Sequence, residues 1–136
     1  MLRSIFLGLV FWSILIPLSA QTSVSDLLRS AQKAESVEAL RYYLEALQIT
    51  KKDSASAHLQ AKIEEEIGHI YQREGLHEKA LSYFSHLIQG NDSTEAHLLE
   101  DAAISAFALQ NYSLARTLYQ KSLSIHQAKN DIPRTL

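Results

Sequence analysis

Short apolar stripes at helical spacing recur along most of this sequence. One stripe runs through Leu59, Ile63 and Ile67, and the next runs through Leu81 and Phe84. Apolar residues three or four positions apart lie on one side of an α-helix, whereas a half-buried strand needs alternating apolar and polar residues. No window of the sequence alternates for long enough to indicate a strand. The sequence therefore predicts an all-α fold.

Turn-forming residues separate these stripes. Gly75 and Gly90 each follow a stripe and can adopt the left-handed backbone conformation that ends a helix. Asp92 stands three residues before Glu95, an arrangement that resembles the capping box at the start of a helix. These boundaries predict six helices, near residues 22–33, 36–50, 54–74, 77–89, 94–109 and 112–128.

A small residue one helical turn ahead of an aromatic residue occurs three times. The pairs are Ala39 and Tyr43, Ala80 and Phe84, and Ala115 and Tyr119. Successive pairs begin 41 and 35 residues apart, which is the spacing expected of stacked two-helix repeats with one longer member. The chain thus contains an internal repeat.

The small residues of this repeat indicate where helices cross closely, because two antiparallel helices approach each other only if a small side chain lies at the contact. We expect Gly68 to meet Ala80 at one such crossing, with Tyr71 and Phe84 in the wedge beside it. The residues expected to meet at the next crossing are Ala103 and Ala115.

The stretch from Ile67 to Phe84 resembles the tetratricopeptide repeat. Ile67-Gly68-x2-Tyr71, then Gly75, then Ala80-x3-Phe84 is similar to the family's pattern of a Leu-Gly pair, a Tyr and a later Ala before an aromatic residue. Residues 96–128 match less fully, residues 22–50 match only in their second helix, and Glu64 stands where the family frequently has Trp. The resemblance implies a superhelical array of about three helix-turn-helix repeats over 21–136, near 22–50, 54–92 and 94–128.

The first twenty residues have the order of a secretory signal peptide. Arg3 precedes an uncharged apolar run over residues 5–18, which is shorter than the roughly 20 residues of a membrane-spanning helix. Ala20 provides the small residue that signal peptidase requires. We predict cleavage after Ala20 and an exported bacterial protein, periplasmic or secreted, with no stable membrane span after cleavage. The alternative is an uncleaved signal anchor.

Composition and motifs argue against several classes of function. With 13 basic and 15 acidic residues and no cysteine, the chain lacks the charge for nucleic-acid or anionic-membrane binding and the thiols for disulfides. It also lacks a Gly-x-Ser-x-Gly elbow and a glycine-rich phosphate loop. We therefore expect a protein that is not an enzyme, with no catalytic residue and no cofactor.

The six histidines raise the question of a metal site. Glu66-x2-His69 has the helical spacing of a carboxylate–imidazole ligand pair, but a di-metal helical site needs this motif twice and no second copy occurs. We therefore expect no metal site and interpret the histidines as solvated surface residues. The run Glu64-Glu65-Glu66 is likewise interpreted as a solvated helix face.

The resemblance also implies a binding surface, because the first helix of each tetratricopeptide repeat lines the concave face. The matching positions here are Lys62, Glu65, His69, Gln72 and Arg73 in one repeat, and His97, Glu100, Ile104, Phe107 and Ala108 in the next. Some family members hold a terminal carboxylate with a lysine, asparagine and arginine clamp. This chain departs from that clamp, because His69 and Ile104 occupy the asparagine position. Ordinary solvated helix surface is the alternative for all of these residues.

The sequence thus predicts a scaffold that binds a protein or peptide outside the cytoplasm. The alternative is the sensory region of a longer membrane-bound histidine kinase or transcription regulator. The longer repeat of this chain resembles the repeats in the sensory regions of such proteins. Pro133 prevents the last residues from forming a capping helix. We therefore expect the edge formed by Leu114, Leu118 and Ile125 to stay partly exposed, which would permit self-association through the C-terminal repeat.

Cleavage after Ala20 can be tested directly. The protein isolated from the exporting cell is expected to begin at Gln21, because residues 18–20 end in a small side chain just after the apolar run. Intact-mass measurement would show this, and retention of residues 1–20 would favour a membrane anchor instead.

Overall fold

The computed structural model describes residues 23–52, 56–90 and 95–130. These residues form α1 (Val24–Ala31), α2 (Ser36–Thr50), α3 (Ala57–Arg73), α4 (His77–Gln89), α5 (Ala96–Ala108) and α6 (Tyr112–Asn130). The predicted all-α class is confirmed, and each helix lies within a few residues of its predicted range. No helix in the described part of the chain is long and apolar enough to span a membrane.

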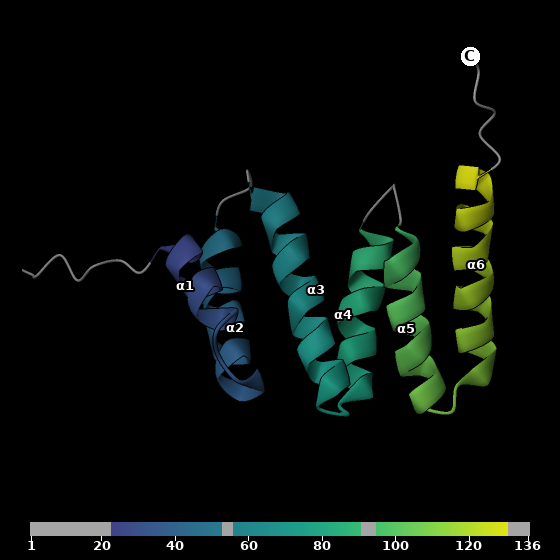
Figure 1. The fold of residues 1–136 in the computed structure, drawn as a ribbon, viewed down its shortest axis with the longest axis horizontal. Coiled ribbons are helices and arrows are strands. Elements are labelled where there is room, and N and C mark those ends of the chain that lie inside the picture. The colour runs from purple at the N-terminus through teal and green to yellow at the C-terminus, as the bar shows by residue number, and fades with distance from the viewer. Residues whose placement is uncertain (1–22, 53–55, 91–94, 131–136) are drawn as a thin grey trace, which may run out of the picture.

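The helices lie side by side in chain order, and consecutive helices run in opposite directions (Figure 1). Each helix packs mainly on the ones before and after it in the chain. The buried apolar residues accordingly form two clusters. One joins α1, α2 and α3 and includes Leu27, Tyr43 and Ile67, and the other joins α4, α5 and α6 and includes Phe84 and Ala102.

The hairpin α3–α4 and the hairpin α5–α6 follow the same backbone frame at an offset of 35 residues. Gly75 has a φ of 73°, and Gln110, which is 35 residues later, has a φ of 61°. The amide of Leu76 donates to the carbonyl of Tyr71 at 2.8 Å, and Asn111 donates to Ala106 at 2.9 Å in the matching bond. Both turns are therefore Schellman motifs, as expected for Gly75 but not for Gln110. The turn between α1 and α2 uses shorter-range bonds instead, such as Ala34 to Ala31.

Two predicted helix boundaries are wrong in detail. Gly90 has a φ of −83° and keeps a right-handed conformation, since its amide continues the helical bonding to His86. Glu95 is itself the N-cap of α5 and makes no side-chain capping bond, so it is not the third residue of a capping box. The proposed capping residue Asp92 lies outside the described residues.

Gly68 accommodates a different neighbour from the one predicted. A Cβ atom on Gly68 would lie 2.8 Å from Cε1 of Phe84, so the closest approach is to the aromatic ring and not to Ala80. Phe84 and Ala80 are both fully buried, whereas Tyr71 is only partly buried and touches both clusters. A small residue is needed at position 68 because Phe84, one turn after Ala80 on α4, packs its ring against α3 there.

The predicted C-terminal edge is confirmed for Leu114 and Ile125, which stay partly exposed, and is wrong for Leu118. Leu118 is buried, and Leu114 and Ile125 are partly buried against the second cluster. The large apolar residues of α6 that are exposed are Tyr112, Tyr119 and Leu123. Small residues on α5 explain why Leu118 is buried, because they let α6 approach α5 closely. The predicted close crossing of small residues here agrees with the burial of both Ala103 and Ala115.

The left-handed residue Gln110 provides a test of the repeated frame. Because a non-glycine residue in this conformation costs roughly 1–2 kcal/mol, we expect Gln110→Gly to raise the free energy of unfolding by about 1 kcal/mol. Gly75→Ala should lower it by a similar amount, and for conformational reasons alone, since no atom lies within 4 Å of the added Cβ. Urea unfolding measures both variants. A loss of stability in Gln110→Gly would contradict the shared turn geometry.

Candidate functional site

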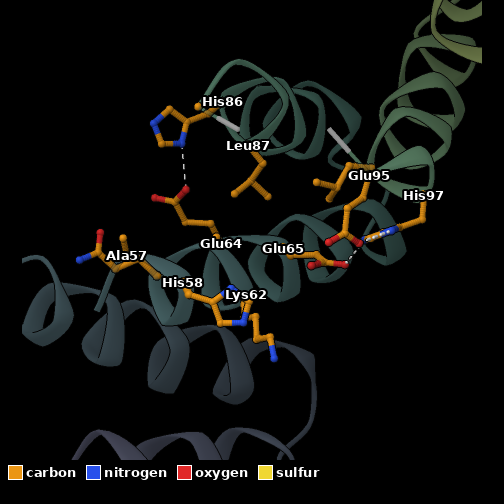
Figure 2. A pocket seen from close by; sticks show the side chains of 13 residues that line it. Ala57, His58, Lys62, Glu64, Glu65, His86, Leu87, Glu95 and His97 are labelled. Carbon is orange, nitrogen blue, oxygen red and sulfur yellow. Dashed lines mark hydrogen bonds and ion pairs between the residues drawn. The ribbon is translucent and has the colours of Figure 1, made fainter. Parts of the chain in front are cut away.

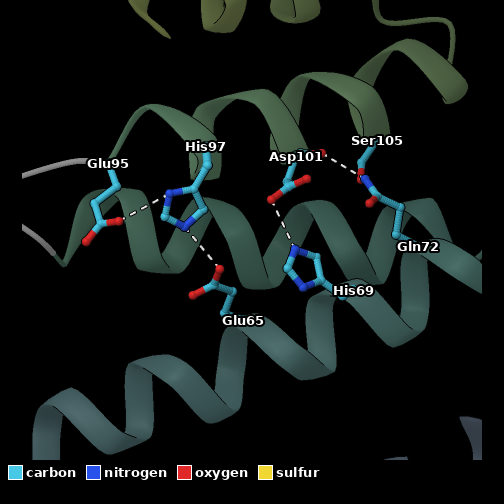
Figure 3. Close-up of polar contacts among 7 residues, drawn as sticks. All are labelled: Glu65, His69, Gln72, Glu95, His97, Asp101 and Ser105. Atoms are coloured by element: carbon cyan, nitrogen blue, oxygen red, sulfur yellow. Dashed lines mark hydrogen bonds and ion pairs between the residues drawn. The ribbon is translucent and has the colours of Figure 1, made fainter. Parts of the chain in front are cut away.

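Three pairs of polar side chains connect α3 with α5 along one line (Figure 3). We call this set the polar ladder; its pairs are Glu65 with His97, His69 with Asp101, and Gln72 with Ser105, each at 3.0 Å. The α3 members and the α5 members are each spaced by about one helical turn, so each set lies on a single helix face. The ladder therefore fixes how α5 is placed along α3.

The central pair of the ladder is the least exposed of its ion pairs. The side chains of His69 and Asp101 are 29% and 21% exposed, and the His69 ring also lies 5.4 Å from the ring of Phe84. The hydrogen bond to Asp101 raises the pKa of His69 above its usual value, and nearby carboxylates reinforce the rise. Partial burial of the ring opposes this shift but does not cancel it. Proton binding to His69 is thus coupled to the contact between α3 and α5.

Two further histidines bridge neighbouring helices. His86 on α4 lies 2.8 Å from Glu64 on α3, and His126 on α6 lies 3.0 Å from Glu100 on α5. Four of the six histidines thus pair with a carboxylate on another helix. The interpretation as a solvated surface residue is wrong for the partly buried His69, whereas His86, His97 and His126 are exposed. The solvated-face interpretation also fails for Glu64, which is buried. The 35-residue repeat could have indicated that Glu64 is buried, because Glu64 corresponds to Leu99, which is also buried.

A cavity of about 550 Å³ opens where α3, α4 and α5 meet (Figure 2). Its lining includes three histidines, three glutamates and a lysine: His58, His86, His97, Glu64, Glu65, Glu95 and Lys62. His97 joins two of the glutamates, with Nδ1 at 3.2 Å from Glu95. Within the described ranges, no group of three or more histidine, aspartate or glutamate side chains is arranged to hold a metal ion. His69 of the Glu66-x2-His69 motif is engaged by Asp101.

The residues of the predicted concave face fall into different environments. Glu65, His69, Gln72 and His97 belong to the polar ladder, and Lys62 and Arg73 are exposed on α3. Glu100 accepts hydrogen bonds from Ser122 at 2.6 Å and from His126 at 3.0 Å, and these bonds lower the pKa of its carboxyl group. Ile104, Phe107 and Ala108 are exposed. The predicted residues therefore divide between an internal contact, which includes His97 of α5, and exposed positions on both helices.

The exposed surface of α5 continues onto α6 as a shallow groove of about 430 Å³. We call it the α5–α6 groove; it is lined by Glu100, Ile104, Tyr119, Ser122, Leu123 and His126. Its apolar residues are well exposed, at 45% for Ile104, 44% for Tyr119 and 55% for Leu123. Beside it, the exposed rings of Phe107 and Tyr112 meet edge to face with centroids 5.2 Å apart. Sequence reasoning identified Tyr119 only as the aromatic residue of a repeat pair, so it placed neither Tyr119 nor Leu123 on an exposed surface.

The raised pKa of His69 predicts a pH-dependent contribution to stability. A group whose pKa is higher in the folded chain stabilises the fold below its unfolded pKa, and the contribution is lost as the pH rises through the folded pKa. The variant His69→Gln retains a hydrogen-bond donor but does not titrate. We expect the wild type to exceed this variant in unfolding free energy most at about pH 5.5 and least at about pH 8.5, as measured by urea unfolding.

The matched control for this experiment is His58→Gln, since His58 is an exposed histidine on the same helix. Its unfolding free energy should stay within about 0.5 kcal/mol of the wild type at both pH values. A difference between wild type and His69→Gln that does not change with pH would contradict the raised pKa of His69.

The two sides of α5 therefore differ in chemistry. His97, Asp101 and Ser105 bond to α3, whereas Ile104 and Phe107 form part of an exposed apolar surface. No protein-family model, curated protein or solved structure matches this chain.

Proposed function

We propose that this protein is a non-catalytic scaffold that binds a protein or peptide outside the cytoplasm, and that the surface around the α5–α6 groove makes the contact. The observation that carries the proposal is the distribution of exposed large apolar side chains. Of the eight found in the described residues, six lie in the stretch from Ile104 to Leu123; three of these line the α5–α6 groove, and two others, Phe107 and Tyr112, contact each other. Apolar side chains gathered on one surface, rather than scattered singly, are typical of interaction sites.

The repeated architecture supports the same proposal. The shared backbone frame of α3–α4 and α5–α6 favours our interpretation of the chain as a tetratricopeptide-type array. Arrays of this kind present extended surfaces made from equivalent positions of successive repeats, and such surfaces suit protein ligands. Export is proposed from the order of residues 1–20, which lie outside the described residues.

Site-specific photocrosslinking in cells that export the protein tests the proposal. With a benzophenone amino acid in place of Phe107 or Leu123, we expect ultraviolet light to produce an adduct of higher mass, because both side chains are exposed in the proposed contact. Substitution at Val37, which is 79% exposed on α2, serves as the control and should give none.

Specificity of the adduct is checked with a second substitution. Ile104→Glu places a charge in the apolar surface and should greatly reduce the adduct formed at Leu123. An adduct with the mass of two copies of this chain would contradict a separate partner and favour self-association through the C-terminal repeat. Equal crosslinking at Val37 and Leu123, or none at either, would contradict the proposed surface.

A further inference from the structure

The offset of 35 residues between the two hairpins relates the α5–α6 groove to the surface formed by α3 and α4, which another helix covers. Three groove residues, Glu100, Ile104 and Tyr119, correspond to Glu65, His69 and Phe84. The corresponding residues differ greatly in exposure: the Phe84 side chain is fully buried, whereas Tyr119 is 44% exposed. Two things differ between these surfaces: the Phe84 ring lies over Gly68, where the second hairpin has Ala103, and the first surface is covered by another helix.

The surface formed by α3 and α4 is covered by α5. Leu98, Leu99 and Ala102 of α5 belong to the same buried cluster as Phe84 and Leu87 of α4. The polar row His97, Asp101 and Ser105 of α5 meets α3 through the polar ladder. The occupant of this surface is therefore an amphipathic helix with a polar row at positions i, i+4 and i+8 and a neighbouring apolar row.

The α5–α6 groove, together with Phe107 one turn beyond Ile104 on α5, presents a different set of side chains to such a helix. Glu100 keeps the carboxylate of Glu65, but Ile104 replaces His69 and Phe107 replaces Gln72 at the corresponding positions. A polar side chain packed against these apolar residues would lose its hydrogen bond to water without gaining another. The occupant should therefore be apolar where α5 has Asp101 and Ser105, and should keep a hydrogen-bond donor where α5 has His97.

We propose that the α5–α6 groove binds an amphipathic α-helix of a partner protein, placed as α5 is placed on α3 and α4. This inference rests on the proposed scaffold function and names its ligand class: a helix with a hydrogen-bond donor at position i and apolar residues at i+4 and i+8. The donor faces Glu100, and the apolar residues face Ile104 and Phe107.

The first described helix of the chain, α1, is a poor occupant of this groove. The exposed side chains of α1 include Ser25, Asp26 and Arg29, so its outward surface is polar. Asp26 and Arg29 also pair with each other at 3.2 Å. Head-to-tail stacking of copies would place this polar surface on Ile104 and Leu123, which disfavours a second copy in that arrangement.

The ligand class can be tested with peptides derived from α5. One peptide has the sequence of residues 95–110, and a second differs from it by Asp101→Leu and Ser105→Leu; both carry two added lysines at each end for solubility. We expect the second peptide to bind the purified protein at least about tenfold more tightly, as measured by fluorescence anisotropy, because it buries no unpaired polar side chain. Equal or weaker binding of the second peptide would overturn the proposal.

A reciprocal change in the protein checks the register of the bound helix. The double variant Ile104→His with Phe107→Gln restores the side chains that α3 presents to α5, and both positions are exposed enough to be replaced without unfolding the chain. Its preference should reverse, so that the peptide with the natural sequence binds more tightly. Leu123→Glu should weaken binding of the second peptide at least about tenfold, whereas Val37→Glu should leave it unchanged. An unreversed preference, or equal effects of the last two variants, would overturn the proposal.

A third peptide separates this inference from the proposed function. Adding Ala102→Pro to the second peptide prevents helix formation, and its binding should be lost. If the proline peptide binds as well as its parent, the groove accepts extended chains, and the helix proposal fails while a peptide-binding function stands. If no peptide binds but crosslinking through Leu123 persists, the ligand class is again wrong and the scaffold function survives. Dimers in sedimentation that Leu123→Glu dissociates would make a second copy the occupant and overturn the proposal.

Discussion

A row of helices can bury apolar side chains only between neighbours, and this constraint determines much of the structure. The contacts within the row are close because small residues lie between the helices, as Ala102, Ala103 and Ala106 do on α5. A large residue such as Phe84 fits only where a glycine, here Gly68, faces its ring. Among the described helices α6 packs mainly on α5, and it keeps apolar residues exposed where α4, packed on both α3 and α5, buries them. The exposed surface is thus a consequence of the packing rule.

The narrow apolar contacts do not determine how far one helix is shifted along its neighbour, and polar pairs do. Contacts between alanine side chains have little directional preference, whereas a hydrogen bond between two particular side chains sets the position of one helix along another. The polar ladder does this for α3 and α5, and His86 with Glu64 does it for α3 and α4. Partly exposed ion pairs contribute only about 0–1 kcal/mol each to stability. Their contribution here is mainly to the register of the helices.

Sequence reasoning predicted the features that depend on one helix at a time. Periodicity together with turn residues predicted the six helices of the described residues, and the glycine signal predicted the turn at Gly75. It failed where the answer depends on which neighbour a side chain reaches: Phe84 rather than Ala80 meets Gly68, and Glu64 is buried beside His86. It also failed at Gln110, where the frame of the hairpin imposes a left-handed residue that its own preference does not favour. The exposure of Tyr119 and Leu123 could not be predicted, because periodicity identifies an apolar row but not whether a helix covers it.

The comparison of the two hairpins shows how one backbone frame can produce an internal contact or a binding surface. Turn geometry and the small buried residues hold the frame, and they are shared by α3–α4 and by α5–α6. The outward rows are not needed to hold it, so their chemistry can differ between the hairpins. His69 and Gln72 suit the polar row of α5, whereas Ile104 and Phe107 suit an apolar one. The contact between α5 and the α3–α4 surface is therefore a physical template for what the α5–α6 surface can bind, and the replaced side chains indicate how that ligand differs from α5.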